Sequence, residues 1–236
     1  MSDDVALAAD ACIQWHDAWV RSAGVPTETD DDAWRALTQP PFIYFGAITR
    51  RAAADAGSLV TGFGAVCDSW SHLDLEPHGF RRLDSEPWFS RPAGPAPAED
   101  DPPELEIVQV RSPAEIEEFE LVSIRGFQDE AATIEPGSIH PPSIVADRRM
   151  TMWLGRVDGR AVGAAMSYRT DRAVGIFGVT TVASARGRGY GTALTRTALL
   201  VDTGLPAVLA PSPQAERLYQ RIGFRSVGQL QKWVRA

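Results

Sequence analysis

The fold is decided by residues 178–192, which read Gly-Val-Thr-Thr-Val-Ala-Ser-Ala-Arg-Gly-Arg-Gly-Tyr-Gly-Thr. An apolar run ends before Arg186, and a helical pattern begins around Gly191. The sequence therefore predicts a strand, a tight glycine loop and a helix N-terminus in direct succession. Such a loop can aim several backbone N–H groups at one anion, which the helix dipole also attracts. We predict a phosphate- or pyrophosphate-bearing ligand, with Arg186 and Arg188 adding side-chain charge.

Two other glycine loops fit this stretch less well. The mononucleotide P-loop needs Lys and then Ser or Thr after its last glycine, whereas Thr-Ala follows Gly191. The dinucleotide loop needs a parallel βαβ unit and an acidic residue about 20 positions further on, and Asp202 comes too early. The pattern that fits is Arg-x-x-Gly-x-Gly, formed by Arg186, Gly189 and Gly191.

This pattern resembles the pyrophosphate loop of the GNAT acetyltransferase superfamily, whose co-substrate is acetyl-CoA. A second stretch, 215–224, reads Ala-Glu-Arg-Leu-Tyr-Gln-Arg-Ile-Gly-Phe. It resembles the later motif of the same superfamily, in which a helix carries Leu-Tyr and Gly-Phe enters the last strand. Leu218, Tyr219 and Ile222 share one helical face by their spacing. The resemblance covers residues 105–236 and makes acetyl-CoA, with no metal, the expected co-substrate.

Composition narrows the class of protein. The 236 residues are 44% hydrophobic and 23% charged, which is ordinary for a globular protein. The net charge of −8 disfavours nucleic acid and is compatible with a cationic amine substrate. We expect no membrane segment, and the two cysteines, Cys12 and Cys67, suggest a reducing cytoplasm. Lys232 is the only lysine beside many arginines and alanines, which suggests a bacterial source.

Residues 91–104 divide the chain. They are rich in Pro and acidic residues and show no apolar periodicity, so they predict a linker. The prediction is a divergent N-terminal α/β lobe at 1–90, this linker, and a GNAT-like acetyltransferase domain at 105–236.

The C-terminal domain is expected to follow the GNAT order of elements. Ser112 and Glu115 predict a capping box before a helix that starts at Pro113. Asp158-Gly159 predicts a tight hairpin turn. The other expected elements are strands at 105–110, 152–157, 161–168, 174–182 and 207–210, a helix to about Val201, a helix carrying Tyr219, and a last strand from Phe224. The expected fold class is α/β, a three-layer domain whose mixed, mainly antiparallel sheet is flanked by helices.

The N-terminal lobe gives weaker signals. We expect helices at 5–21, 30–37 and 57–69 and a strand at 41–49. Residues 76–83 weakly echo 220–227, which fits a decayed second GNAT-like half. The lobe lacks an Arg-x-x-Gly-x-Gly pattern, so it is expected to bind no cofactor and to shape the substrate cleft.

The resemblance assigns the cofactor site residue by residue. It implies that the strand before the loop splays, with Gly178 marking a bulge, so that backbone N–H groups face the pantetheine and the thioester carbonyl. The implied cofactor-binding residues are Val179, Thr180, Thr181, Val182, Arg186, Gly187, Arg188, Gly189, Tyr190, Gly191 and Thr192.

Tyr219 matches the family tyrosine that protonates the departing thiolate. Its phenol has a reference pKa of about 10, against about 8.5 for a thiol, so this transfer is mildly uphill. The alternative is a buried tyrosine on an amphipathic helix.

The general base is left open, because residues 175–182 contain no carboxylate or histidine. The candidates are Asp129, Glu130, Glu135 and His140 of the variable segment and His72, Glu76 and His78 of the N-terminal lobe. His140 titrates near neutrality and is expected in a loop that borders the substrate.

The function predicted from these observations is transfer of an acetyl group from acetyl-CoA to a primary amine of a small molecule, peptide or protein. The alternative is a non-catalytic acyl-CoA-binding sensor or regulatory module.

Overall fold

The computed structural model describes residues 2–60 and 62–236, and the chain divides into two compact units. The first unit combines Met1–Ser90, Val208–Glu216 and Arg225–Ala236. The second combines Arg91–Ala207 and Arg217–Phe224. The last strand therefore joins the first unit, although the domain prediction placed it in 105–236.

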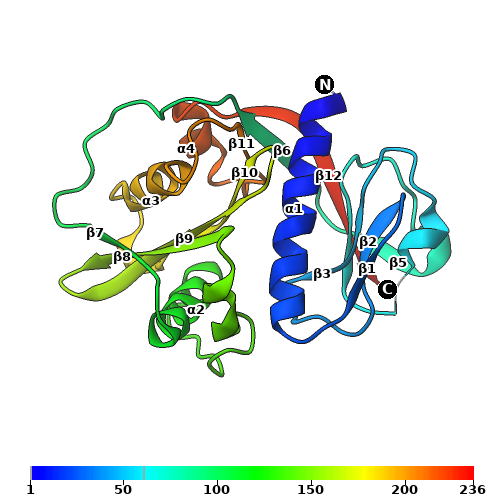
Figure 1. Ribbon diagram of the computed structural model, residues 1–236, viewed down its shortest axis with the longest axis horizontal. Coiled ribbons are helices and arrows are strands. Elements are labelled where there is room, and N and C mark those ends of the chain that lie inside the picture. Colours follow the sequence, from blue (N-terminus) through cyan, green and yellow to red (C-terminus); the bar gives the residue numbers. More distant parts are fainter. Residues whose placement is uncertain (1, 61) are drawn as a thin grey trace. The chain divides into compact units, whose positions relative to one another are not determined.

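The first unit is a sheet covered by one long helix (Figure 1). Its strand order is β1-β2-β3-β4-β12-β6, with β5 paired to β12, and only β3 and β4 run parallel. Its elements are α1 (Ser2–Ser22), β1 (Thr27–Thr29), β2 (Ala33–Ala36), β3 (Phe45–Thr49), η1 (Ala56–Leu59), β4 (Ala65–Asp68), η2 (Glu76–His78), β5 (Phe80–Arg82), β6 (Glu86–Arg91) and β12 (Arg225–Arg235).

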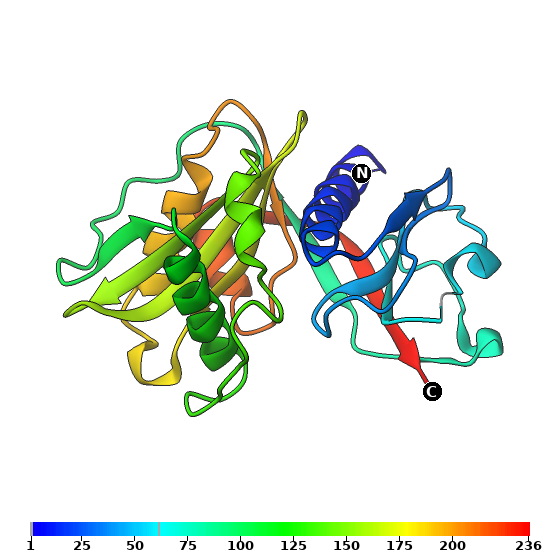
Figure 2. The same cartoon turned by 60° about the horizontal axis from the view of Figure 1, so that its bottom comes forward.

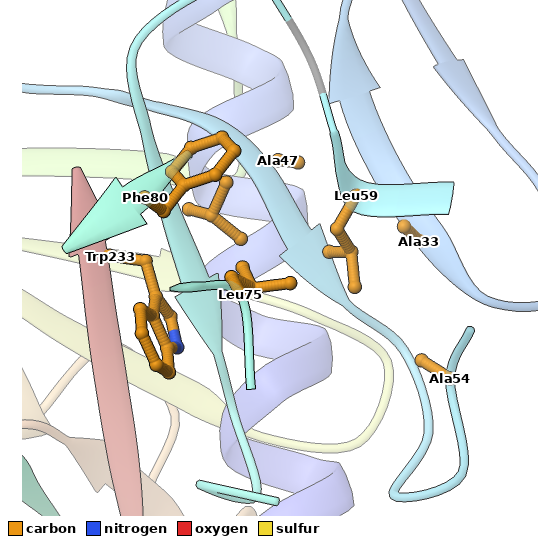
Figure 3. Packing of buried hydrophobic residues seen from close by; sticks show 8 residues of the cluster. Ala33, Ala47, Ala54, Leu59, Leu75, Phe80 and Trp233 are labelled. Atoms are coloured by element: carbon orange, nitrogen blue, oxygen red, sulfur yellow. The ribbon is translucent and has the colours of Figure 1, made fainter. Parts of the chain in front are cut away.

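The apolar core of this unit explains why β12 belongs to it. Figure 3 shows Trp233 of β12 beside Phe80 and Leu75, in a cluster of eight buried residues. Trp233 is only 3% exposed. Burying a tryptophan removes a large apolar area from water, so β12 stabilises this core although it lies more than 130 residues away in sequence from β6.

Two predicted helices of this lobe are wrong. The helix predicted at 30–37 is the strand β2, and the one at 57–69 is replaced by η1 and the strand β4. Trp34 pairs with Ile48 of β3 and with Thr29 of β1, and tertiary pairing of this kind overrides a local apolar pattern. The helix at 5–21 is confirmed as α1, and part of 41–49 forms β3.

The second unit has the predicted three layers. Its elements are β7 (Glu106–Gln109), α2 (Pro113–Phe127), η3 (Pro142–Ala146), β8 (Met150–Val157), β9 (Arg160–Arg169), β10 (Val174–Thr181), η4 (Ala183–Ala185), α3 (Tyr190–Leu199), β11 (Ala207–Leu209), shared with the first unit, and α4 (Glu216–Arg221). Strands β7, β8, β9 and β10 form antiparallel ladders in that order. Figure 2 shows α2 on one face of this sheet and α3 on the other.

Close packing fixes both helices on the sheet. A Cβ atom added to Gly126 of α2 would lie 2.1 Å from Thr180 Oγ1, and one added to Gly163 of β9 would lie 2.8 Å from Leu194 of α3. Gly163 pairs with Thr181, the neighbour of Thr180. Because successive strand residues face opposite sides, the two helices cover opposite faces of the sheet.

The capping box and the hairpin turn that the sequence predicted in this unit are confirmed. Ser112 accepts the Glu115 N–H, and the Glu115 side chain accepts the Ser112 N–H, which completes the capping box of α2. Asp158 and Gly159 have φ angles of 50° and 75°, as the predicted hairpin turn requires.

Candidate functional site

The glycine loop joins the end of β10 to the start of α3. Gly187 and Gly189 have φ angles of 77° and 85°, a left-handed region that favours glycine. Gly189 is the N-cap of α3, and nothing lies within 4 Å of a Cβ built on Gly187. The loop is therefore open on at least one side, and its glycines are needed for its path.

Five consecutive backbone N–H groups of the loop, from Gly187 to Gly191, are unused within residues 2–60 and 62–236. The next two donors are satisfied, since Thr192 and Ala193 donate to the Gly189 carbonyl at 3.0 and 3.1 Å. Unused donors at the start of a helix coincide with the positive end of its dipole. This run of N–H groups can hold an anion such as a pyrophosphate.

Arg186 donates side-chain hydrogen bonds to two backbone carbonyls in this structure. Its Nε donates to the Thr181 carbonyl at 3.1 Å, and its Nη2 donates to the Gly126 carbonyl at 2.8 Å. Glu130 adds a second link close by, because its carboxylate accepts the N–H of Ser184 at 3.0 Å as well as the Ser184 hydroxyl. These contacts tie the entry of the glycine loop to the C-terminal end of α2.

Tyr190 is hydrogen-bonded to Glu104, a residue that sequence reasoning did not single out. Tyr190 is 1% exposed, and its hydroxyl donates to Glu104 Oε1 at 2.8 Å. This hydrogen bond raises the pKa of Tyr190 and lowers that of Glu104, and the positive charge of Arg188 acts on both pKa values in the lowering direction. The run of acidic residues around Glu104 was the available sequence signal.

The predicted irregularity of β10 is present at Gly178. The register with β9 shifts between Phe177 and Thr180, and Gly178 has a φ of 58°. Gly178 and Val179 therefore leave the regular ladder with β9. The Val182 N–H is occupied, because it donates to the Val162 carbonyl at 2.9 Å. Of the strand residues predicted to face a cofactor, Val179 is the one that the bulge sets apart.

Tyr219 lies beside α3 in a buried position. It is 6% exposed, its ring meets Phe224 edge-on at 5.9 Å, and Thr195 is close enough to its hydroxyl to act on its pKa. Thr195 in turn donates to the Gly191 carbonyl at 2.7 Å. Burial raises the pKa of Tyr219 to about 12, so its phenol stays protonated and is a weaker acid than its reference value implies.

His140 lies in a loop, as expected, but its side chain is buried. It is 1% exposed and its ring meets Phe119 of α2 edge-on at 5.4 Å. Burial lowers its pKa to about 3. The carboxylate of Glu120, itself fully buried, fixes this segment by accepting the N–H groups of Gly137, Ile139 and His140 at 2.6–2.8 Å. Tertiary packing against α2 thus overrides the polar, Pro-rich local sequence.

The other candidate bases are exposed carboxylates and histidines. Glu130 is held by Ser184, and these hydrogen bonds lower its pKa. Glu135 and Asp129 are exposed in the second unit, and His72, Glu76 and His78 are exposed in the first. In the described part of the chain, no His, Cys, Asp and Glu side chains gather in a group that would suit a metal ion. None of its helices is long and apolar enough to cross a membrane.

Residues 114–224, which hold the glycine loop and Tyr219, match the model of the acetyltransferase (GNAT) family. This part of the chain is an acetyltransferase domain. It belongs to the GNAT family. No curated protein matches the sequence.

Solved structures resemble the whole chain in fold. A GCN5-related N-acetyltransferase from Kribbella flavida has 18% identity and a TM-score of 0.67, over 96% of this chain and 94% of its own. An acetyltransferase of the GNAT family from Novosphingobium aromaticivorans has 21% identity and a TM-score of 0.60, over 93% and 94%. A GCN5-related N-acetyltransferase-like protein from Streptococcus suis has 16% identity and a TM-score of 0.51, over 99% and 98%.

Proposed function

We propose that this protein transfers an acetyl group from acetyl-CoA to a primary amine of a small molecule, a peptide or a protein. The observation that carries the proposal is the run of unused N–H groups from Gly187 to Gly191, at the start of α3. Backbone donors at a helix N-terminus suit the pyrophosphate of coenzyme A. The GNAT family of the domain supports the acetyl group and the amine acceptor.

The residues around the loop suggest how the chain would assist the reaction. Val179, set apart by the bulge, is in the right strand to donate its N–H to the thioester carbonyl, where negative charge develops. Thr195, which acts on the pKa of Tyr219, donates to the Gly191 carbonyl, so the proposed proton donor lies near the residue that anchors to the loop. Both roles depend on the co-substrate lying along β10 and the start of α3.

The proposal also says which part of the chain binds the co-substrate. The cofactor site lies entirely within 105–236, and residues 1–90 bind no coenzyme A. Hydrogen exchange with and without coenzyme A tests this, because protection should concentrate at 178–192 and 215–224. Protection centred on a segment of 1–90 would contradict it.

Acyl-CoA binding without transfer is the second candidate, and the burial of two residues favours it. His140 is packed against Phe119, and burial raises the pKa of Tyr219 to about 12, which makes both poor partners for proton transfer. A sensor needs the loop but no proton relay.

Release of free coenzyme A from acetyl-CoA over a panel of primary amines separates the two functions. Transfer predicts amine-dependent release that is lost in the loop variant Gly189→Val. Binding of acetyl-CoA by calorimetry, together with no release on any amine, would favour the sensor. Failure of the protein to bind acetyl-CoA at all would contradict both.

A further inference from the structure

Arg91, the last residue of β6 and the first of the second unit, is a buried arginine that binds the protein backbone. The residue is 8% exposed. Its Nε donates to the Ile222 carbonyl at 2.9 Å, and its Nη1 donates to the Gly94 carbonyl at 2.8 Å. The guanidinium also donates to the carbonyls of Pro92 and Pro95. Within residues 2–60 and 62–236 its hydrogen-bond partners are all backbone carbonyls, which offset the burial of its charge.

These bonds join two segments that are distant in sequence. Ile222, which follows the end of α4, lies 131 residues after Arg91, whereas residues 92–95 open the predicted linker. Figure 1 shows the segment after β6 running past α4. A guanidinium holds its N–H donors in a rigid plane, so it can bind several carbonyls in one fixed geometry. Arg91 therefore holds the end of α4 against the start of the linker.

The end of α4 is a C-cap that contains Tyr219. Gly223 has a φ of 95°, and the Phe224 N–H donates to the Tyr219 carbonyl at 3.0 Å. This is the pattern of a Schellman cap, which a side-chain contact across the cap often accompanies. Here the rings of Tyr219 and Phe224 make that contact edge-on. The cap leaves the Ile222 carbonyl without a helical partner, and Arg91 supplies the donor.

The Arg91 side chain lies directly on this cap. A Cβ atom built on Gly223 would lie 3.4 Å from Arg91 Nε and 3.8 Å from its Cδ. The guanidinium thus packs on the residue whose left-handed conformation turns the chain from α4 into Phe224. Tyr219 is coupled to this turn through both its carbonyl and its ring. A shift of the guanidinium would therefore move the Tyr219 side chain.

We propose that Arg91 is a positioning residue for acetyl transfer, which fixes the C-cap of α4 and through it the phenol of Tyr219. The inference rests on the proposed function, in which Tyr219 protonates the departing thiolate. Proton transfer requires the donor oxygen to lie within hydrogen-bond reach of its acceptor. A small displacement of the phenol should therefore lower the rate and leave the binding of acetyl-CoA unchanged.

The kinetic test compares Arg91→Met and Arg91→Lys with wild type, using an amine that the panel identifies. Arg91→Met should lower kcat by about 10- to 100-fold, the scale of a displacement of about an ångström. Its affinity for acetyl-CoA, measured by calorimetry, should stay close to wild type. Arg91→Lys should lose less, because its ammonium can reach one of the two segments but cannot span both.

Arg196→Met is the matched control. Arg196 of α3 also donates to a carbonyl of the predicted linker, that of Glu99, and it pairs with Asp101 of the same segment. Its replacement frees the linker from α3 and leaves the cap of α4 intact, so kcat should stay close to wild type.

A double-mutant cycle with Tyr219→Phe separates positioning from general damage to the fold. If Arg91 acts through the phenol, both Arg91 variants should cost little further in kcat once the phenol oxygen is absent. A side chain that only stabilised the fold would lower kcat by the same factor in both backgrounds. Should Arg91→Met fail to fold, Arg91→Lys provides the same comparison.

A second measurement needs no turnover. The ring signals of isotope-labelled tyrosine in the NMR spectrum report where Tyr219 lies relative to Phe224, and Tyr219→Phe assigns them. These signals should shift in Arg91→Lys, while those of Tyr168 stay in place. The Phe224 amide should also exchange faster in this variant. Arg196→Met should change neither quantity.

The outcomes separate this inference from the proposed function. Unchanged Tyr219 signals in the Arg91 variants, or an equal loss of kcat in both Tyr219 backgrounds, would overturn the inference while turnover by wild type upholds the proposed function. Shifted Tyr219 signals without turnover by wild type on any amine would uphold the hold of Arg91 on Tyr219 and contradict the proposed function. Unchanged signals together with no turnover by wild type would contradict both.

Discussion

The guanidinium of Arg186 donates from Nη2 to the carbonyl oxygen of Gly126 at 2.8 Å. This bond joins the glycine loop to the last turn of α2, which lies 60 residues earlier in the sequence. Gly126 is also a point where α2 approaches β10 closely, since a Cβ there would lie 2.1 Å from Thr180 Oγ1. The position of the loop therefore depends on α2 as well as on its own glycines.

Arg186→Ala should lower both stability and coenzyme A affinity. The change removes two hydrogen bonds to backbone carbonyls and frees the loop entry, so we expect a loss of about 1–2 kcal/mol in the free energy of unfolding. Urea denaturation and calorimetry measure the two effects. Arg188→Ala is the matched control and should change stability by less than about 0.5 kcal/mol. Equal effects of the two changes on stability would contradict the structural role of Arg186.

The two glycines on either side of Tyr190 should respond differently to alanine. Gly189 has a φ of 85°, so Gly189→Ala should cost about 1–2 kcal/mol in stability through backbone strain. Gly191 lies in α3 without a positive φ, and an added Cβ would meet Leu218 Cδ1 at an ordinary 3.5 Å. Gly191→Ala should leave thermal stability unchanged or raise it by up to about 1 kcal/mol. The reverse order of melting temperatures would count against this loop geometry.

Tyr219→Phe should lower turnover by roughly 10- to 10⁴-fold, the range of general acid catalysis, and leave acetyl-CoA affinity close to wild type. Stability should change by about 1 kcal/mol or less, because only a hydroxyl is removed. Steady-state kinetics with an amine from the panel, together with calorimetry, measure these quantities. Normal turnover in this variant would contradict a catalytic role for Tyr219 and leave it only a packing role against Phe224.

Acid should destabilise the protein through its two buried histidines. Burial lowers the pKa of His16 to about 4 and that of His140 to about 3. In the unfolded chain both titrate near pH 6.5, so the unfolded state binds more protons below that pH. The free energy of unfolding should therefore fall as pH decreases from about 6.5 toward 4.

Urea denaturation between pH 4.5 and 7.5, as an experimental range, should show this slope, and it should be smaller in His140→Gln. His72→Gln and His78→Gln are the controls, because both side chains are exposed. An unchanged slope in His140→Gln would show that His140 does not titrate as its burial requires.

Trp233→Ala should destabilise the first unit strongly. Trp233 is 3% exposed in the core of Figure 3, and removing a buried aromatic side chain costs about 3–5 kcal/mol. Exchange of the backbone amides of β4 and β5, the strands that pair with β12, should become faster. Slow exchange in both strands of Trp233→Ala would contradict the place of β12 in this core.

The sequence by itself determined the elements whose signals are local. The capping box at Ser112, the Asp158-Gly159 turn and the glycine loop each depend on backbone geometry within a few residues, so their residue types specify them. The order of strands and helices from 105 onward followed from these signals and from the two motifs, and it gave the correct fold class.

Only the tertiary structure decided the features that depend on distant partners. Trp34 lies in a strand because β1 and β3 pair with it, and β12 belongs to the first unit because Trp233 fills its core. The His140 segment is fixed by Glu120, whose buried carboxylate accepts the neighbouring N–H groups. Arg186 donates to Gly126, and Tyr190 donates to Glu104. Such contacts join residues that are far apart in sequence, and their hydrogen bonds and burial exist only once the chain has folded, so no local pattern specifies them.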